Sequence, residues 1–194
     1  MYGLDFLSNP PDDAHIALVY DRPEQRDALV ARFINDGLEK GQVCAYGTVR
    51  YRVQGHLETM SSMIKDFDRH VKEGNLIIID FAPFFHAAMT GDMKPFADAK
   101  KMLEEKLQGR KSKQARVIGD AVELMFDNDE FDPCASLEGW WQENFEAGIT
   151  LCTYKRSSIR SNYHDIQFHR AVRATHDYVV DASAGSARPA QMSG

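Results

Sequence analysis

The stretch that decides the fold class is HIALVYDRPEQRD, residues 15–27. Its first half is an apolar run with the length of a buried strand, and Asp21-Arg22-Pro23 ends that run. Beyond it, apolar side chains recur at a spacing of three and four residues. This spacing predicts a helix over about residues 24–40 that stops at Gly41. A strand, a turn and an amphipathic helix in this order predict the start of a layered α/β domain.

The same pattern returns along the chain. Short apolar runs predict further strands at residues 43–47, 76–81, 116–120, 149–154 and 178–180. Helical apolar stripes fall between them, at residues 57–71, 92–107, 136–145 and 161–174. This alternation predicts a three-layer α/β fold, in which a mainly parallel sheet carries helices on both faces.

Composition limits the classes of function. The 194 residues are 43% hydrophobic and carry a net charge of −6, which argues against direct binding to nucleic acid. No apolar run is long enough for a membrane span, and with no secretion signal and three scattered cysteines we expect a cytoplasmic protein. We predict an N-terminal extension on the surface over residues 1–13, a domain over 14–181, and a disordered tail over 182–194.

The turn after the first strand lacks a phosphate-binding loop. The strand and helix follow the rhythm of nucleotide-binding ATPases, whose loop needs glycines and a Lys-Ser/Thr pair. Residues 21–27 read DRPEQRD instead, with three acidic side chains and a proline that has no N–H to donate. The chain also lacks a G-x-S-x-G elbow. We therefore predict no enzymatic activity and no cofactor.

Polar and aromatic residues gather where the predicted strands end, which is where open α/β sheets bind ligands. Asp80 and Asp120 each close an apolar run, and Phe81 begins the aromatic segment FAPFF. Such a segment would suit an apolar small-molecule pocket, and ordinary core packing is the simpler interpretation. Each acidic residue could equally cap a helix or pair with a nearby arginine.

A second candidate lies near the C-terminus, where Asp165, His169 and His176 have a spacing that a metal site could use. A polar helix face explains these residues more simply, and we predict no metal. Cys152 falls within a predicted strand, where a free cysteine usually behaves as a small buried hydrophobe.

Five short motifs occur in order along the chain. They are HIALVYD (15–21) with GLEKGQ (37–42), RVIGD (116–120), NFE (144–146), LCTY (151–154) and TH (175–176). Together they resemble the MEDS domain, the methanogen/methylotroph DcmR sensory domain, over about residues 14–181. The chain departs from the family pattern at Lys155 and Asp177.

The resemblance implies a RecA/KaiC-like fold that has lost its phosphate loop. It also implies a sensory role in signal transduction, with hydrocarbon derivatives as proposed ligands. Family members often accompany a helix-turn-helix or histidine-kinase module, and we find no second module here. The resemblance therefore implies output through a partner chain, such as a histidine kinase or a transcription regulator, or through a homo-oligomer.

We predict a non-enzymatic sensory domain with a ligand pocket at the carboxyl rim of the sheet, where Arg22 pairs with a carboxylate until a ligand displaces it. The predicted ligand-binding residues are His15, Tyr20, Asp21, Arg22, Asp80, Phe81, Asp120, Glu123, Glu146, Tyr154 and His176. Two alternatives stay open. One is a degenerate nucleotide-binding module that uses Asp80 or Asp120 with magnesium, and the other is an adaptor with Trp140 and Trp141 as interface anchors.

Overall fold

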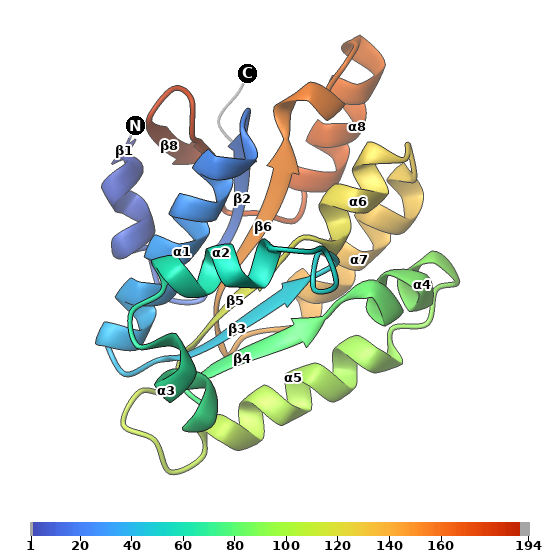
Figure 1. The fold of residues 1–194 in the computed structure, drawn as a ribbon. Helices are drawn as coiled ribbons and strands as arrows, with labels where there is room; N and C mark the ends of the chain where they lie inside the picture. Colours follow the sequence, from blue (N-terminus) through green and yellow to red (C-terminus); the bar gives the residue numbers. More distant parts are fainter. Residues whose placement is uncertain (1, 191–194) are drawn as a thin grey trace.

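An eight-stranded sheet crosses the computed structural model, which describes residues 2–190 (Figure 1). The strand order is β1-β8-β7-β2-β6-β5-β3-β4, and the six strands from β7 to β4 are parallel. The strands are β1 (Tyr2–Gly3), β2 (His15–Tyr20), β3 (Val43–Thr48), β4 (Leu76–Asp80), β5 (Ala115–Gly119), β6 (Gly148–Lys155), β7 (Tyr178–Asp181) and β8 (Ser186–Pro189).

Helices connect the parallel strands and cover both faces of the sheet, so the predicted three-layer α/β fold is confirmed. The α-helices are α1 (Pro23–Glu39), α2 (His56–Met63), α3 (Phe67–Lys72), α4 (Ala82–Met89), α5 (Lys94–Leu107), α6 (Ala121–Asp127), α7 (Phe131–Asn144) and α8 (Asn162–Arg173), with 3-10 turns η1 (Leu4–Ser8) and η2 (Arg156–Ser158). No helix within residues 2–190 has both the length and the apolar character that a membrane crossing needs.

Three helix predictions need correction. The single helix expected over residues 57–71 is two helices, α2 and α3, separated at Asp66 by a backbone φ of 50°. Helix α7 starts at Phe131 rather than at Ser136. Helices α4 and α6 were not predicted, because each is only seven or eight residues long and shows little more than two turns of pattern.

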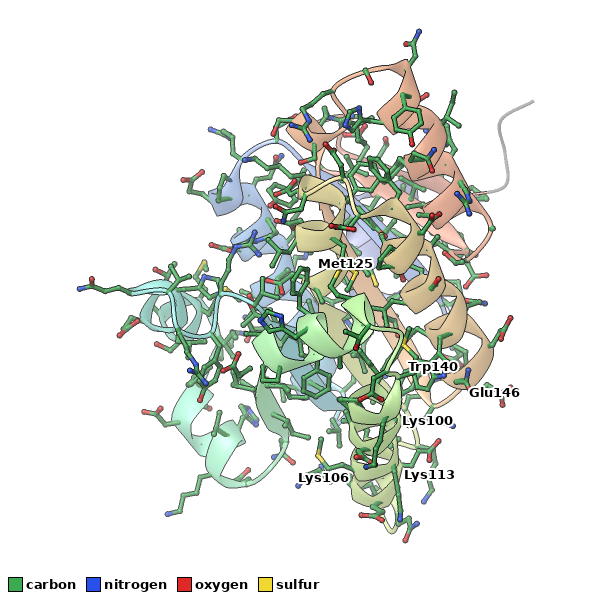
Figure 2. All side chains as sticks on the ribbon, turned by 90° about the vertical axis from the view of Figure 1, so that its right-hand side faces the viewer. Lys100, Lys106, Lys113, Met125, Trp140 and Glu146 are labelled. Atoms are coloured by element: carbon green, nitrogen blue, oxygen red, sulfur yellow. The ribbon has the colours of Figure 1, made fainter. Side chains whose placement is uncertain are left out.

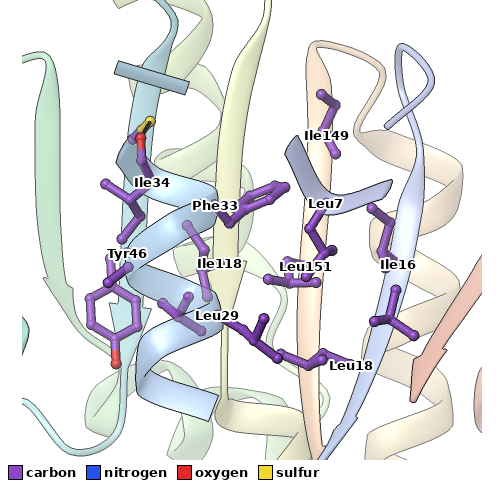
Figure 3. Close-up of a cluster of buried hydrophobic side chains, with 14 of the residues drawn as sticks. Leu7, Ile16, Leu18, Leu29, Phe33, Ile34, Tyr46, Ile118, Ile149 and Leu151 are labelled. Carbon is purple, nitrogen blue, oxygen red and sulfur yellow. Dashed lines mark hydrogen bonds between the residues drawn. The ribbon is translucent and has the colours of Figure 1, made fainter. Parts of the chain in front are cut away.

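Side chains alternate along each strand, so every inner strand serves two cores. The face covered by α1 and α2, here the α1 face, buries Ile16, Leu18 and Leu151 in one cluster with Leu29 and Phe33 of α1 (Figure 3). Proline at the first turn of α1 fits its helix start. The regular apolar stripe of α1 thus lies against the sheet, as the sequence predicts.

The opposite face, here the α7 face, is covered by α4, α5, α6, α7 and α8. Val19 and Cys152 from the strands share a cluster there with Phe126, Leu137 and Phe168 from α6, α7 and α8. Helix α5 packs nearby through Leu103 and Leu107. The α7 face therefore draws its helices from the chain after β4, as Figure 1 shows.

Both chain ends join the sheet at one edge. Ser186–Pro189, within the segment predicted to be disordered, forms β8 and pairs antiparallel with β7 and β1. That prediction is wrong for these residues, and residues 191–194 lie outside the described part. The N-terminal extension is not wholly on the surface either, since Leu7 is buried and its carbonyl accepts a hydrogen bond from Arg116. Strand pairing stabilises a tail whose small side chains alone predict disorder.

Candidate functional site

A group of polar side chains, buried except for the half-buried Arg50, closes the carboxyl end of the sheet on the α1 face. We call it the rim cluster. Its members come from β2, α1, the end of β3, the loop after it, α6 and β6. They are Tyr20, Arg26, Asp27, Thr48, Arg50, Asp120, Glu123 and Thr153.

The rim cluster is bonded internally. Nη1 of Arg50 donates to Oδ2 of Asp120 over 2.6 Å, and Nη2 of the same arginine bonds Glu123. Glu123 also accepts hydrogen bonds from the hydroxyls of Tyr20 (2.7 Å) and Thr153 (2.6 Å). Arg26 donates to Oδ1 of Asp27 over 2.5 Å. Two arginines thus face three carboxylates within one network.

Burial is the main electrostatic influence at the rim. It raises the pKa of Asp120, although the charge of Arg50 and the Thr48 hydroxyl lower it in part. Burial works against the charged form of Arg50, but Glu123 and Asp120 outweigh it and raise the pKa of the guanidinium. Arg50 therefore stays charged and already donates to two carboxylates, and these carboxylates would repel a phosphate group.

A second group of polar side chains lies inside the α7 face. We call it the core cluster, and it consists of His15, Glu138, Cys152, Tyr154 and His176. The parallel register pairs His15 with Thr150, so Cys152, two residues further along β6, lies on the same face of the sheet as His15. Glu138 comes from α7, and His176 follows α8.

The core cluster is compact and fully buried. Nε2 of His15 lies 3.2 Å from Oε2 of Glu138 and 3.4 Å from Sγ of Cys152. Nε2 of His176 lies 3.5 Å from Oε1 of Glu138, and the Tyr154 hydroxyl donates to that same oxygen. The two imidazole rings stack with centroids 3.8 Å apart. Glu138 is only 1% exposed.

Opposing influences set the protonation of this cluster. Burial would raise the pKa of Glu138, but His176, His15 and the Tyr154 hydroxyl outweigh it and hold that pKa well below its usual value. Burial opposes the charge on His15, yet its contacts with Glu138 raise its pKa. Burial and the charge of His15 lower the pKa of His176 to about 3. These shifts favour a charged pair of Glu138 and His15 beside a neutral His176.

An apolar cavity of about 40 Å³ lies beside the core cluster on the α7 face. Glu138 and Cys152 belong to both the cavity wall and the core cluster. The remaining lining is almost entirely apolar: Phe81, Phe96, Val117, Gly119, Ala121, Val122, Leu137, Trp141 and Thr150. Phe81 reaches this wall because Gly47 has no side chain, since a Cβ there would lie 2.1 Å from the ring.

The predicted site residues do not share one pocket. Tyr20, Asp120 and Glu123 lie in the rim cluster, whereas His15, Tyr154 and His176 lie in the core cluster. Phe81 lines the cavity. The other four predicted residues, Asp21, Arg22, Asp80 and Glu146, lie outside all three.

Two of those four are held in ion pairs. Asp21 lies 3.1 Å from Nε of Arg156, and Asp80 lies 2.8 Å from Nε of Arg52. Arg22 is an exposed residue at the start of α1, so the arginines that pair with the rim carboxylates are Arg26 and Arg50 instead.

Glu146 is exposed just before the amino end of β6, the edge of the sheet opposite the rim. Figure 2 shows it well away from Met125 of α6. It therefore cannot contact a ligand together with Asp120.

The structure also places two further groups of residues that the sequence singled out. His169 pairs with Asp165 over 3.4 Å, while His176 is buried in the core cluster, so these three residues do not meet. Trp140 and Trp141 are half-buried against the core, and Nε1 of Trp141 donates to Thr150. Neither tryptophan is an exposed interface anchor.

Sequence reasoning missed Arg26, Arg50 and Glu138, and it treated Cys152 as simple core. One signal for Glu138 was available, because it stands seven residues after Phe131 and four after Cys134, on the apolar stripe of α7. An acid at such a position needs a buried partner. Arg50 lies in a loop and gave no comparable signal.

Residues 14–177 match the model of a family described as MEDS, the MEthanogen/methylotroph, DcmR Sensory domain. The match covers most of the chain, including both clusters and the cavity. The chain belongs to the MEDS family. The resemblance seen in the sequence is thus confirmed, and membership supports a sensory role for this MEDS domain.

Solved structures show the same fold at low sequence identity. A KaiC-like protein from Pyrococcus horikoshii OT3 has 18% identity and a TM-score of 0.61, covering 88% of this chain and 71% of its own. An uncharacterized P. horikoshii protein, solved with an unknown peptide, has 11% identity and a TM-score of 0.67, with coverages of 93% and 84%. The flagellar accessory protein FlaH from Methanocaldococcus jannaschii has 13% identity and a TM-score of 0.50, with coverages of 92% and 75%.

No curated protein matches this sequence. The likeness to KaiC-like structures, together with the strand order, establishes the RecA/KaiC-like fold expected from the resemblance. It establishes the fold alone.

Proposed function

We propose that this MEDS domain senses a small apolar molecule that binds in the cavity of the α7 face, and that it does so without catalysing a reaction. The supporting observation is the cavity lining, which is apolar except for Glu138, Cys152 and Thr150, whose hydroxyl already accepts a hydrogen bond from Trp141. Apolar walls with a few convergent polar groups are typical of small-molecule sites.

The size of the cavity limits the ligand. One water needs roughly 10–15 Å³ of such space, so 40 Å³ holds a molecule of only a few non-hydrogen atoms. A short hydrocarbon carrying one polar or halogen substituent fits both the volume and the single polar end. This proposal differs from the rim pocket expected from the sequence, because the rim carboxylates already have arginine partners.

The output of the sensor is proposed to run through a partner chain, such as a histidine kinase or a transcription regulator, in the cytoplasm. A bound ligand would touch β5, α6 and α7 together. It would thereby fix two helices whose outer surfaces another chain, or a second copy of this one, can contact. A partner chain that contacts these helices could then respond to a bound ligand without any movement of the sheet.

A size series of ligands tests the proposal. Thermal unfolding would be followed with one- to six-carbon haloalkanes and alcohols, since a ligand at 100 times its Kd adds about 2.7 kcal/mol to the free energy of unfolding. We expect stabilisation by the shortest compounds and none by the longest. Equal responses across the series, or no response to any member, would contradict the proposal.

A matched pair of variants locates the site. Val117→Leu adds one methylene to the cavity wall, and Val30→Leu adds one to the buried cluster of the α1 face. Both changes crowd a core, and each is expected to cost about 1–3 kcal/mol of stability. Only Val117→Leu should abolish the response to the short ligands. Loss of the response in both variants, or in neither, would exclude this cavity.

A further inference from the structure

The core cluster contains four metal-ligand atoms that converge from separate parts of the fold. His15 begins β2, Cys152 lies in β6, Glu138 lies in α7, and His176 stands between α8 and β7. Each is at most 5% exposed, and one donor atom from each lies within 4.8 Å of all the others. Within residues 2–190, no other set of three or more His, Cys, Asp or Glu side chains meets this condition.

Three of the donor atoms have the spacing of a tetrahedral metal site, and the fourth, on His176, lies within 4.8 Å of them. Zinc binds histidine nitrogen, carboxylate oxygen and thiolate sulfur at about 2.0–2.3 Å, which puts neighbouring donors of a tetrahedron about 3.3–3.7 Å apart. The distances here are 3.2 Å from His15 to Glu138, 3.4 Å from His15 to Cys152, and 3.5 Å from Cys152 to Glu138. His176 lies 3.5 Å from the second carboxylate oxygen.

The outer nitrogen of each imidazole is held by hydrogen-bond acceptors. Nδ1 of His15 lies 2.7 Å from the carbonyl of Thr175, and Nδ1 of His176 lies 3.2 Å from the carbonyl of Val172. A carbonyl only accepts, so Nδ1 carries the hydrogen in both rings. Nε2 of His176 then directs a lone pair into the cluster, and Nε2 of His15 does so once it has given up its proton. Histidines that bind metals are commonly oriented in this way.

One atom of the cluster has no partner at all. Nε2 of His176 is buried without a hydrogen bond, and its neighbour Oε1 of Glu138 is also an acceptor. A buried acceptor left unpaired costs about 1–3 kcal/mol, so it needs an explanation. Among the described residues, no lysine or arginine pairs with Glu138. A cation between the four donors would satisfy the nitrogen and balance the carboxylate.

We infer that His15, Glu138, Cys152 and His176 bind one tetrahedral divalent transition-metal ion, with Zn²⁺ the best match to two nitrogens, one thiolate and one carboxylate. Two protons go to solvent when the metal binds, one from the Cys152 thiol and one from the His15 imidazolium, since thiolate and neutral imidazole are the ligands. The Tyr154 hydroxyl, which bonds the carboxylate, is a positioning residue for Glu138. All four tetrahedral positions come from the protein, so the metal would be structural.

A metal at this place would join β2, β6, α7 and the segment before β7. It would also fix the polar wall of the cavity, because Glu138 and Cys152 line both. Metal binding does not require that the cavity hold a ligand, and a ligand could enter without the metal. The two proposals can therefore fail separately.

The test uses the untagged chain, unfolded in denaturant with a chelator and refolded with or without ZnCl₂ or CoCl₂. We expect one metal per chain after removal of excess ion, measured by elemental mass spectrometry. The cobalt form should show the visible absorption of a tetrahedral site together with a thiolate-to-cobalt charge-transfer band. A folded chain that binds no metal, or binds cobalt without the thiolate band, would overturn the proposal.

Two buried cysteines provide a matched pair of variants. Cys152→Ser removes a proposed ligand, while Cys134→Ser changes a thiol that is equally buried and lies 3.9 Å from the Tyr154 hydroxyl. Cys152→Ser should lose the charge-transfer band and at least about 100-fold in zinc affinity, and Cys134→Ser should keep both.

If Cys152→Ser does not fold, Tyr154→Phe provides the second readout. It should keep the charge-transfer band and lose about 10–100-fold in zinc affinity, as is common when a residue that orients a metal ligand is replaced. Unchanged affinity in every variant that folds would show that the metal binds elsewhere.

Discussion

The rim cluster and the core cluster both bury carboxylates, but they balance them with different cations. At the rim, Glu123 and Asp120 face Arg50 and Arg26. In the core, Glu138 faces His15 and His176. A guanidinium keeps its charge at any relevant pH, whereas an imidazole can release its proton and then bind a metal. The rim is therefore a fixed ionic network, and the core can change its charge with its occupant.

The largest expected effect separates the two carboxylates. Glu123→Gln should lower the free energy of unfolding by about 3–5 kcal/mol, because two arginines lose a buried partner and cannot deprotonate. Glu138→Gln, measured with a chelator present, should cost only about 1–2 kcal/mol, because His15 can become neutral. Denaturant unfolding of both variants measures the difference. Equal losses of unfolding free energy would mean that His15 gives up its charge no more readily than the arginines do.

Removing the rim cation gives the next largest effect and a pH signature. Arg50→Met should cost roughly 2–3 kcal/mol near pH 8, somewhat below the value for a fully buried pair, because Arg50 is partly exposed. Burial already raises the pKa of Asp120, and loss of Arg50 raises it further. The folded state then holds a proton that the unfolded state releases, so stability is retained at low pH and falls as the pH rises.

Arg52→Met is the matched control for that pH dependence. Arg52 also pairs with a strand-end aspartate, but its side chain is 81% exposed. Such a surface pair contributes little, so we expect a change within about 0.5 kcal/mol and no new pH dependence. Unfolding midpoints measured from pH 5 to pH 8 decide the point. A similar pH slope in both variants would show that burial of Asp120 is not the cause.

A further comparison uses two adjacent residues of β3 that face opposite sides of the sheet. Gly47→Ala should displace Phe81 from the cavity wall, cost about 1–3 kcal/mol and weaken binding of the short ligands. Thr48→Val removes the hydroxyl that donates to Asp120 over 2.7 Å, at a cost of about 1 kcal/mol. It should leave ligand binding unchanged. Thermal unfolding with and without ligand separates the two effects.

The sequence by itself determined the layered fold, because its signals are local. Apolar runs of about six residues and helical stripes of period 3.6 predict buried strands and the helices between them, as in residues 15–40. The lack of a phosphate loop was equally visible in residues 21–27. The tail escaped prediction because Ser186–Pro189 is ordered by pairing with β7 and β1, and its own composition does not show this.

Only the tertiary structure decided the two clusters. Strand order places β2 between β6 and β7, and this order brings His15 beside Cys152 and His176. Local periodicity shows which side chains of a strand are buried. The crossover connections and the strand register decide which distant residues those side chains contact. The pairing of Glu123 with Arg50 depends on those connections in the same way. The sequence therefore predicted a polar rim, and the fold divided its residues between a closed ionic network and a set of converging metal ligands.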